Sequence, residues 1–395
     1  MDLSQRIGHV RGNGSDGWEI YYRMRGMLAA GEKVLNLTIG EGDIKTDPAI
    51  LAAMDASARA GNTGYSMGPG NRALRDEVAA RVTRFTGVPT SWENVVITPG
   101  GQSALFSSHM VLLDPGDRAL FCDPYYATYP GTIRSVGAVP VAVPTRPEAS
   151  FEPQAVDIDA RVAGARTLLV NTPNNPTGVV YGRATLEGIA EVVRARDLWL
   201  ISDEVYDRHV WAGAHLSPRA LPGMADRTVV IGSMSKSHAM TGSRLGWAVA
   251  PVPVAEAITL LATNTTYGVP AFVQDAALFA LRQGDGFEAA IAAPFRRRRL
   301  IAERLLAAQN VVRLVPSSGA MFMMYDIRAT GLSGDAFAHA LLDAERIAVM
   351  PGESFGAAAA GHVRVAMTIA DAAFEQALVR LLAFAAGLAA QLSGG

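Results

Sequence analysis

Short apolar runs alternate with amphipathic stretches through the first part of the chain. Apolar and β-branched runs predict strands at five places: 93–98, 117–123, 166–171, 198–203 and 227–233. Residues 102–113 and 186–197 have the periodicity of helices. Continuously apolar strands separated by helices are typical of a parallel sheet covered on both faces. The pattern therefore predicts an α/β fold.

The pattern changes after about residue 285. Residues 287–309 predict one long helix, interrupted or kinked near Pro294, because proline lacks the amide hydrogen that a helix needs. The four arginines at 296–299 are typical of a solvated helix face. Short strands and helices alternate after that helix.

A chain of 395 residues is too long for one compact core. We expect a large α/β domain over residues 46–285. An N-terminal arm, residues 1–45, and residues 286–395 would together form a smaller α/β domain.

Composition narrows the classes of function. The net charge of −2 gives no basis for a nucleic-acid or anionic-membrane partner. The single cysteine, Cys122, excludes an internal disulfide and suits a reducing compartment. The first residues lack the apolar core of a signal peptide, and the apolar run 381–390 is too short to span a bilayer. We expect a cytoplasmic protein.

Polar residues follow all five predicted strands. The segments are TPGGQSALF, DPYYATY, NTPNNPTG, DEVY and SMSK. Ligands of open α/β sheets bind outside the carboxyl ends of the strands, so these segments can converge on one site.

Each segment also has a plain structural explanation. Gly100 and Gly101 suit a phosphate at a helix start, or an ordinary turn. Asp203 is either a helix cap or the partner of a ligand cation. Asn175 lies among turn formers, and Tyr126 could stack on a flat ring or simply belong to the core.

Lys236 stands apart from these residues. The chain has three lysines, Lys33, Lys45 and Lys236, while arginine supplies the rest of the 35 basic residues. Lysine can lose its proton and act as a nucleophile or form an imine, which arginine cannot do. A lysine at the end of an apolar strand therefore favours a covalent role.

Together these residues fit a flat, phosphorylated aldehyde, pyridoxal 5′-phosphate. Lysine forms the imine, a carboxylate holds the pyridinium nitrogen, and a glycine-rich helix start with a serine and an arginine holds the phosphate. The seven histidines show no metal-ligand spacing, and the chain has no GxGxxG motif. We therefore expect neither a metal nor a nicotinamide cofactor.

The motifs resemble those of class I/II pyridoxal-phosphate-dependent aminotransferases of fold type I, over nearly the whole chain. The strongest are TPGGQSALF, NTPNNPTG, ISDEVY, SMSKSHAMTGSRLGW and GHVRVAM. The resemblance implies a mostly parallel seven-stranded sheet between helices, with a smaller α/β domain. Several segments, including HLSPRALPGMADRT, are most similar to the arginine–pyruvate aminotransferase subgroup.

The resemblance also implies a role for individual residues. Lys236, Asp203 and Tyr206 would be catalytic: Lys236 forms the internal aldimine, Asp203 pairs with the pyridine nitrogen, and Tyr206 bonds the ring's phenolic oxygen. The remaining cofactor contacts would come from Gly101, Gln102, Tyr126, Asn175, Ser233 and Arg244, with Tyr65 reaching the cofactor of the neighbouring subunit in a homodimer.

The substrate would be held mainly by Arg364, whose planar guanidinium can grip an α-carboxylate with two hydrogen bonds. Asn175 and Gly40 would assist it. The implied reaction moves an amino group from an L-amino acid to a 2-oxo acid, pyruvate or 2-oxoglutarate, with ping-pong kinetics. A β-eliminating lyase on the same fold and a non-catalytic regulator are the alternatives.

The chain departs from the pattern of its relatives at several positions. The usual GEPDFDTP reads GEGDIKTD here, with differences at Gly42, Ile44, Lys45 and Asp47. Ser243 stands where relatives often have tryptophan. Gln102 occupies the position of a lysine that holds the distal carboxylate in some aspartate-specific relatives, which argues against aspartate as the donor.

Overall fold

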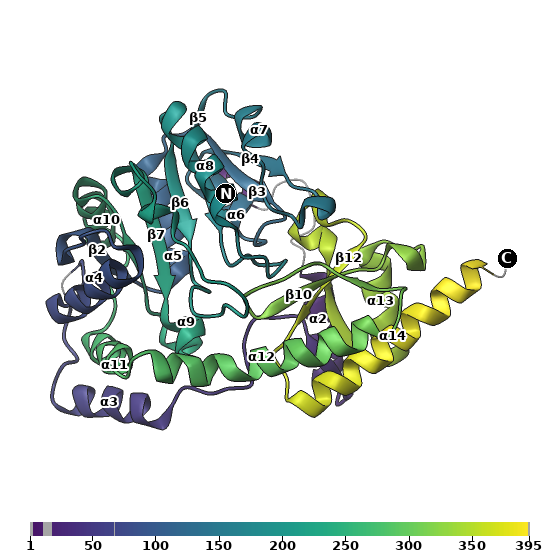
Figure 1. Ribbon diagram of the computed structural model, residues 1–395. Coiled ribbons are helices and arrows are strands. Elements are labelled where there is room, and N and C mark those ends of the chain that lie inside the picture. Colours follow the sequence, from purple (N-terminus) through teal and green to yellow (C-terminus); the bar gives the residue numbers. More distant parts are fainter. Residues whose placement is uncertain (1–2, 11–17, 67, 394–395) are drawn as a thin grey trace.

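The fold consists of two β-sheets, each flanked by helices (Figure 1). A computed structural model describes residues 3–10, 18–66 and 68–393. The larger sheet and its helices form one body, and the smaller sheet with the chain's last helices lies beside it (Figure 1).

The larger sheet has seven strands in the order β2-β8-β7-β6-β5-β3-β4. β8 is antiparallel to both neighbours, and the remaining pairs are parallel. This confirms the expected mostly parallel α/β sheet. Its strands are β2 (Val95–Thr98), β3 (Arg118–Asp123), β4 (Val139–Pro144), β5 (Ala165–Asn171), β6 (Trp199–Asp203), β7 (Thr228–Ser233) and β8 (Gly246–Val249).

Five of these strands are the ones that the hydrophobic pattern predicts. The pattern missed β4 and β8. β4 contains two prolines and pairs only with β3, as expected of an edge strand, since proline cannot donate to a central ladder. β8 has a single β-branched residue, Val249, whereas β2, of the same length, consists of β-branched residues throughout.

Helices cover both faces of this sheet. α5, α6 and α10 pack on one face, around Leu105 and Ile133. α4 and α11 pack on the other face around Val78, and α8 extends that cover around Ile189. The helices of this body are α3 (Pro48–Arg59), α4 (Arg72–Thr86), α5 (Gly101–Leu112), α6 (Tyr129–Ser135), α7 (Ala155–Asp159), α8 (Arg183–Ala195), α9 (Met234–Ser237), α10 (Val252–Thr263) and α11 (Ala271–Leu281).

The smaller sheet has five strands in the order β1-β11-β12-β10-β9. β1 (Leu35–Leu37) comes from the N-terminal part of the chain and pairs in parallel with β11. The others are β9 (Arg313–Leu314), β10 (Phe322–Asp326), β11 (Ile347–Pro351) and β12 (His362–Ala366). The remaining helices are α1 (Gln5–His9), α2 (Glu19–Ala29), α12 (Asp285–Ala307), α13 (Gly334–Glu345) and α14 (Asp371–Ser393). The proposed domain boundaries at 46–285 remain a prediction.

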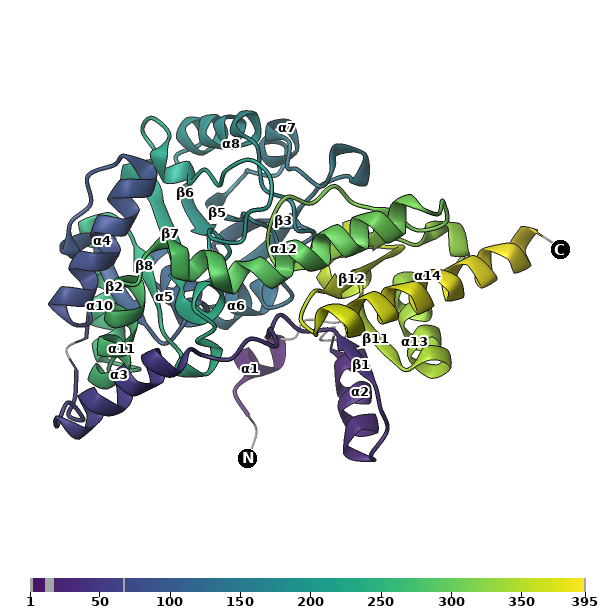
Figure 2. The same cartoon turned by 60° about the horizontal axis from the view of Figure 1, so that its bottom comes forward.

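The long helix α12 runs from the larger body to the smaller one (Figure 2). It is continuous through Pro294, so an interruption there is wrong, while the alternative of a kink at Pro294 stays a prediction. The solvated face expected for residues 296–299 is also wrong in part. Arg298 is only 2% exposed and donates to both carboxylate oxygens of Asp43, at 2.8 and 2.7 Å, and to Asp371 at 2.8 Å. A buried arginine needs such partners, which helix periodicity does not reveal.

The terminal helix α14 is, in the described part of the chain, the one helix long and apolar enough to cross a membrane by length and composition. Its buried residues Phe374, Leu378 and Leu381 belong to the core of the smaller body. The first part of α14 lies against the second half of α12 (Figure 2). This packing is typical of the outer helix of a globular domain.

Candidate active site

The polar segments after the strands meet in a pocket of about 330 Å³ at the carboxyl edge of the larger sheet. All but one of the predicted site residues line it: Gly40, Gly101, Gln102, Tyr126, Asn175, Asp203, Tyr206, Ser233, Lys236, Arg244 and Arg364. The exception is Tyr65. The smaller body supplies Arg364 from β12, so the pocket lies between the two sheets.

Lys236 lies in the short helix α9, which begins directly after β7. The hydroxyl of Ser233 caps this helix by accepting a hydrogen bond from the amide of Ser235 at 3.1 Å. The Nζ of Lys236 donates to the carbonyl oxygen of Gly40. Burial lowers the pKa of Lys236 to about 8, because an ammonium group is poorly solvated there. A neutral, nucleophilic amine is thus accessible close to neutral pH.

Asp203 ends β6 and is buried at the same edge. Its Oδ2 accepts a hydrogen bond from the hydroxyl of Tyr129 at 2.7 Å, and its Oδ1 accepts one from the amide of Val205 at 3.3 Å. Burial raises the pKa of Asp203 to about 6, and the two hydrogen bonds oppose that shift. The carboxylate therefore remains charged at neutral pH and can hold a cation.

Arg364 is buried on β12, and its guanidinium lies 4.2 Å from the ring centre of Phe322 and 4.3 Å from that of Phe355. It donates to the Oδ1 of Asn175 at 2.8 Å and to the carbonyl of Thr38. Burial lowers its pKa to about 10. Within residues 3–10, 18–66 and 68–393, Arg364 has no carboxylate partner, and its Nε has no hydrogen bond. A buried guanidinium without a counter-ion suits an incoming carboxylate.

A cradle for an anion forms where α5 begins. Gly100 adopts a left-handed φ of +79°, and a Cβ there would lie 2.3 Å from Nη2 of Arg244. Glycine is thus required at position 100, because it lets the guanidinium approach the backbone at the helix start. The pocket is lined here by the first amides of α5, by the hydroxyl of Ser233 and by Arg244. These groups together suit a phosphate.

Three tyrosines line the pocket: Tyr126, Tyr129 and Tyr206. The rings of Tyr126 and Tyr129 meet edge to face with centroids 5.8 Å apart. Burial raises the pKa of Tyr206, whose hydroxyl bonds Asn175, so it stays a neutral donor. Gln102 points towards α6, because its Nε2 donates to Thr132 at 2.8 Å and its Oε1 accepts from Thr128 at 3.0 Å.

Tyr65 is not part of this pocket within one chain. Tyr65 is 94% exposed, and the centre of its ring lies 5.4 Å from the ring centre of Tyr267. The expectation that it reaches the site of a neighbouring subunit stays a prediction.

The unusual segment 40–47 lies beside Lys236 and lines an adjoining cavity of about 180 Å³. A Cβ at Gly42 would lie 3.1 Å from the ring of Phe295, so this glycine allows the ring to close over the backbone. Asp47 caps α3 by accepting a hydrogen bond from the amide of Ala49 at 2.7 Å. Nothing in the structure explains Ser243.

Sequence reasoning missed several lining residues. Tyr129 stands three positions after Tyr126 in the segment that follows β3, and this spacing is the one signal that could have found it. Trp18, Glu41, Thr241 and Phe322 also line the pocket. They come from an N-terminal segment, loops and the smaller sheet, so no strand end pointed to them.

The residues present fit pyridoxal phosphate. The pocket combines a buried lysine of lowered pKa, a buried carboxylate and a helix start beside Arg244, which match the aldehyde, pyridine nitrogen and phosphate of that cofactor. In addition, Arg364 without a counter-ion matches a substrate carboxylate.

Comparison with known proteins gives an independent result. Residues 32–381 match the family model for aminotransferase class I and II. The chain is 41% identical to the arginine–pyruvate transaminase AruH of Pseudomonas aeruginosa, over 99% of both chains. It is 34% identical to the aspartate/prephenate aminotransferase of Thermus thermophilus, over 89% of this chain and 90% of that one.

Solved structures agree with this result. The aspartate aminotransferase from Thermus thermophilus with maleate superimposes with a TM-score of 0.91 at 31% identity, covering 98% of this chain and 100% of that one. The aspartate aminotransferase from Thermotoga maritima gives a TM-score of 0.89 at 31% identity, with 97% and 99% covered.

Proposed function

We propose that this chain, which belongs to the class I and II aminotransferases and is a transaminase, takes L-arginine as its amino donor and pyruvate as its acceptor. The observation that carries the substrate assignment is the 41% identity to an arginine–pyruvate transaminase over nearly the whole chain.

The cations of the pocket support this choice over dicarboxylic substrates. Among the described lining residues they are Lys236, Arg244 and Arg364. Arg364 suits the α-carboxylate and Arg244 a phosphate, while Gln102 stands where some aspartate-specific relatives carry a lysine. A distal carboxylate, as in aspartate or 2-oxoglutarate, would therefore lack a partner. Glu41 lines the pocket, is exposed, and can accept hydrogen bonds from a guanidinium.

The cofactor would be pyridoxal 5′-phosphate. Its ring would be surrounded by Lys236, Asp203, Tyr206, Asn175 and Tyr126. Its phosphate would be held by Gly101, Gln102, Ser233 and Arg244. When bound, the cofactor supplies an aldehyde that condenses with amines and a ring that withdraws electrons from the substrate Cα.

The protein's own groups then carry out proton transfer and positioning. Lys236 takes a proton at Nζ from the donor's Cα, which its lowered pKa allows close to neutral pH. Asp203 stays charged and holds a proton on the ring nitrogen opposite it. Arg364 and Asn175 fix the substrate carboxylate, so that Cα faces the lysine.

Donor and acceptor would use the same pocket in turn. One buried arginine, Arg364, serves the α-carboxylate of both substrates, so the donor product must leave before the acceptor binds. This predicts ping-pong kinetics.

The active enzyme would be a cytoplasmic homodimer. The exposed Tyr65 and Tyr267 support a subunit contact, because large aromatic side chains are enriched where surfaces associate. The single cysteine, Cys122, is buried and free, as suits a reducing compartment.

A spectral titration of the purified holoenzyme with the twenty amino acids tests the substrate assignment. L-Arginine should bleach the cofactor's absorbance, and pyruvate should restore it with formation of alanine. Failure of arginine to bleach the band would contradict the donor. Release of ammonia together with pyruvate from a donor would instead indicate a β-eliminating lyase.

A further inference from the structure

A second cavity, of about 540 Å³, lies apart from the active site. It is bounded by α4, the strands β7 and β8, the loop 204–217 and the first half of α12. None of its lining residues lines the pocket around Lys236. Its volume falls within the range of small-molecule sites, roughly 300–1,000 Å³.

Apolar side chains make most of the cavity wall. Phe85 of α4, Trp211 of the loop and Trp247 of β8 face it, and Ala289, Ala292 and Ala293 of α12 leave its space open. A Cβ at Gly232 would lie 2.1 Å from Nε1 of Trp247, so only glycine lets the indole lie against β7. The wall is therefore a formed apolar surface with small residues along one side.

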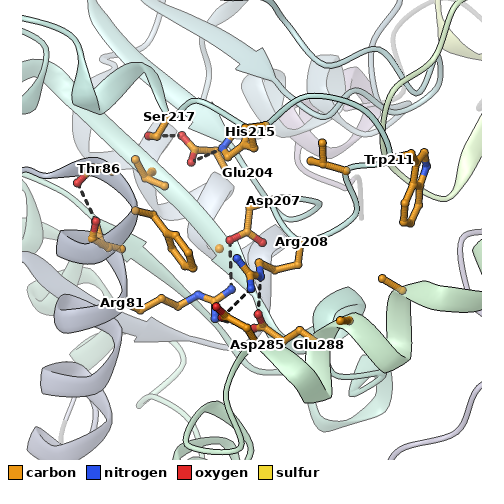
Figure 3. A pocket seen from close by; sticks show the side chains of 18 of the residues that line it. Arg81, Thr86, Glu204, Asp207, Arg208, Trp211, His215, Ser217, Asp285 and Glu288 are labelled. Carbon is orange, nitrogen blue, oxygen red and sulfur yellow. Dashed lines mark hydrogen bonds and ion pairs between the residues drawn. The ribbon is translucent and has the colours of Figure 1, made fainter. Parts of the chain in front are cut away.

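Charged groups lie at two ends of the cavity (Figure 3). At one end, Glu204 bonds His215 at 2.9 Å and accepts from Ser217 at 2.7 Å. At the other end, Arg81 pairs with Asp207 at 3.3 Å and with Glu288.

The acidic residues of the lining are all paired, whereas one of its arginines is not paired with any described residue. Its four acidic residues all have partners: Glu204 pairs with His215, Asp207 with Arg81, Asp285 with Arg208, and Glu288 with both Arg81 and Arg208. Arg297 pairs with Asp371 at 2.8 Å. Over the described ranges 3–10, 18–66 and 68–393, Arg296 has no ion pair. Arg296, an exposed residue of α12 at this cavity, is thus available to pair with a ligand carboxylate.

We propose that this cavity is a second ligand site that takes a small apolar carboxylate. The aromatic or branched body of the ligand lies between Trp211, Trp247 and the alanines of α12, and its carboxylate pairs with Arg296. An amine would instead meet acids that already have partners, and an uncharged ligand would not gain the charge-assisted hydrogen bonds that Arg296 can donate.

Residues that line the cavity are neighbours in sequence of residues that form the active site. Glu204 follows Asp203 directly, and Gly232 precedes Ser233, the residue that caps the helix of Lys236. A ligand in the cavity would lie on the α4 side of the sheet, since Val230 of the lining packs with α4 and α11, whereas Ile231 packs with α5.

Calorimetric titration of the holoenzyme with indole-3-propionate tests the proposal, with indole-3-propionamide as the uncharged match. The acid should bind, and the amide should bind about tenfold more weakly or worse, because it lacks the charge-assisted pair. Arg296→Gln should lower the affinity for the acid to that measured for the amide. Ala293→Trp should fill the cavity and abolish binding.

Two variants on the same helix serve as matched controls. Arg304→Gln and Ala307→Trp change exposed residues outside the cavity and should bind the acid like the original chain. All four variants should keep transaminase activity, which shows that they are folded. The proposal would be overturned if the original chain did not bind the acid. It would also be overturned if all variants bound the acid equally, because that result is expected when the acid binds only in the active site.

Discussion

The hydroxyl of Tyr129 donates a 2.7 Å hydrogen bond to Oδ2 of the buried Asp203. This bond opposes the effect of burial on the pKa of Asp203. A tyrosine from α6 therefore helps to keep the carboxylate charged at the end of β6. Its role is to position and tune Asp203.

Tyr129→Phe should raise the pKa of Asp203 above about 6, because the charged form loses a donor. The carboxylate would then be protonated at higher pH, so the acid limb of kcat/KM should move to higher pH. Tyr125→Phe is the matched control, since Tyr125 does not line the active-site pocket. An unshifted acid limb would show that the bond does not tune Asp203.

Arg364→Lys should raise KM for the amino donor more than it lowers kcat. Lysine keeps the charge but cannot form the paired hydrogen bonds to a carboxylate, so kcat/KM should fall roughly 100-fold, or about 3 kcal/mol. Arg328→Lys, which alters an exposed arginine paired with Asp326, is the control. Unchanged steady-state constants for Arg364→Lys would place the substrate carboxylate elsewhere.

The pH dependence of cofactor capture tests the state of Lys236. Only the neutral amine reacts with an aldehyde, and burial lowers the pKa of Lys236 to about 8. The rate at which apoprotein captures pyridoxal phosphate should therefore rise with pH and reach half its maximum near pH 8. A midpoint near 10.5, the ordinary value for lysine, would refute the lowered pKa.

Arg298→Ala should lower the free energy of unfolding by about 2 kcal/mol, because it removes the hydrogen bonds of a buried arginine to Asp43 and Asp371 and the packing of its side chain. It should also reduce activity, since Asp43 anchors the segment that carries Gly40. Arg297→Ala removes an exposed partner of the same Asp371 and should cost about 0–1 kcal/mol. Equal losses in denaturant unfolding would contradict the anchoring role of Arg298.

Much of the site could be predicted from the sequence because its residues follow strands. Asp203 and Lys236 each come directly after an apolar run, and the edge of a parallel sheet brings such positions together. Arg364 could be assigned only through the family resemblance, because its strand lies in the other sheet.

The rest could not be predicted because it depends on contacts between distant segments. Tyr129 and its partner Asp203 are 74 positions apart, and Arg298 and Asp43 are 255 apart. Helix periodicity predicted a solvated arginine run at 296–299, yet packing against segment 40–47 buries Arg298. The second cavity likewise arises where α4, α12 and the sheet meet, which no local pattern describes.

The most direct test is turnover of L-arginine with pyruvate by the purified holoenzyme and by its Lys236→Ala variant. We predict that the original chain forms alanine and the oxo acid of arginine in equal amounts. The variant should form neither while remaining folded in thermal unfolding. Turnover retained by Lys236→Ala would contradict the assignment of Lys236 on which the account depends.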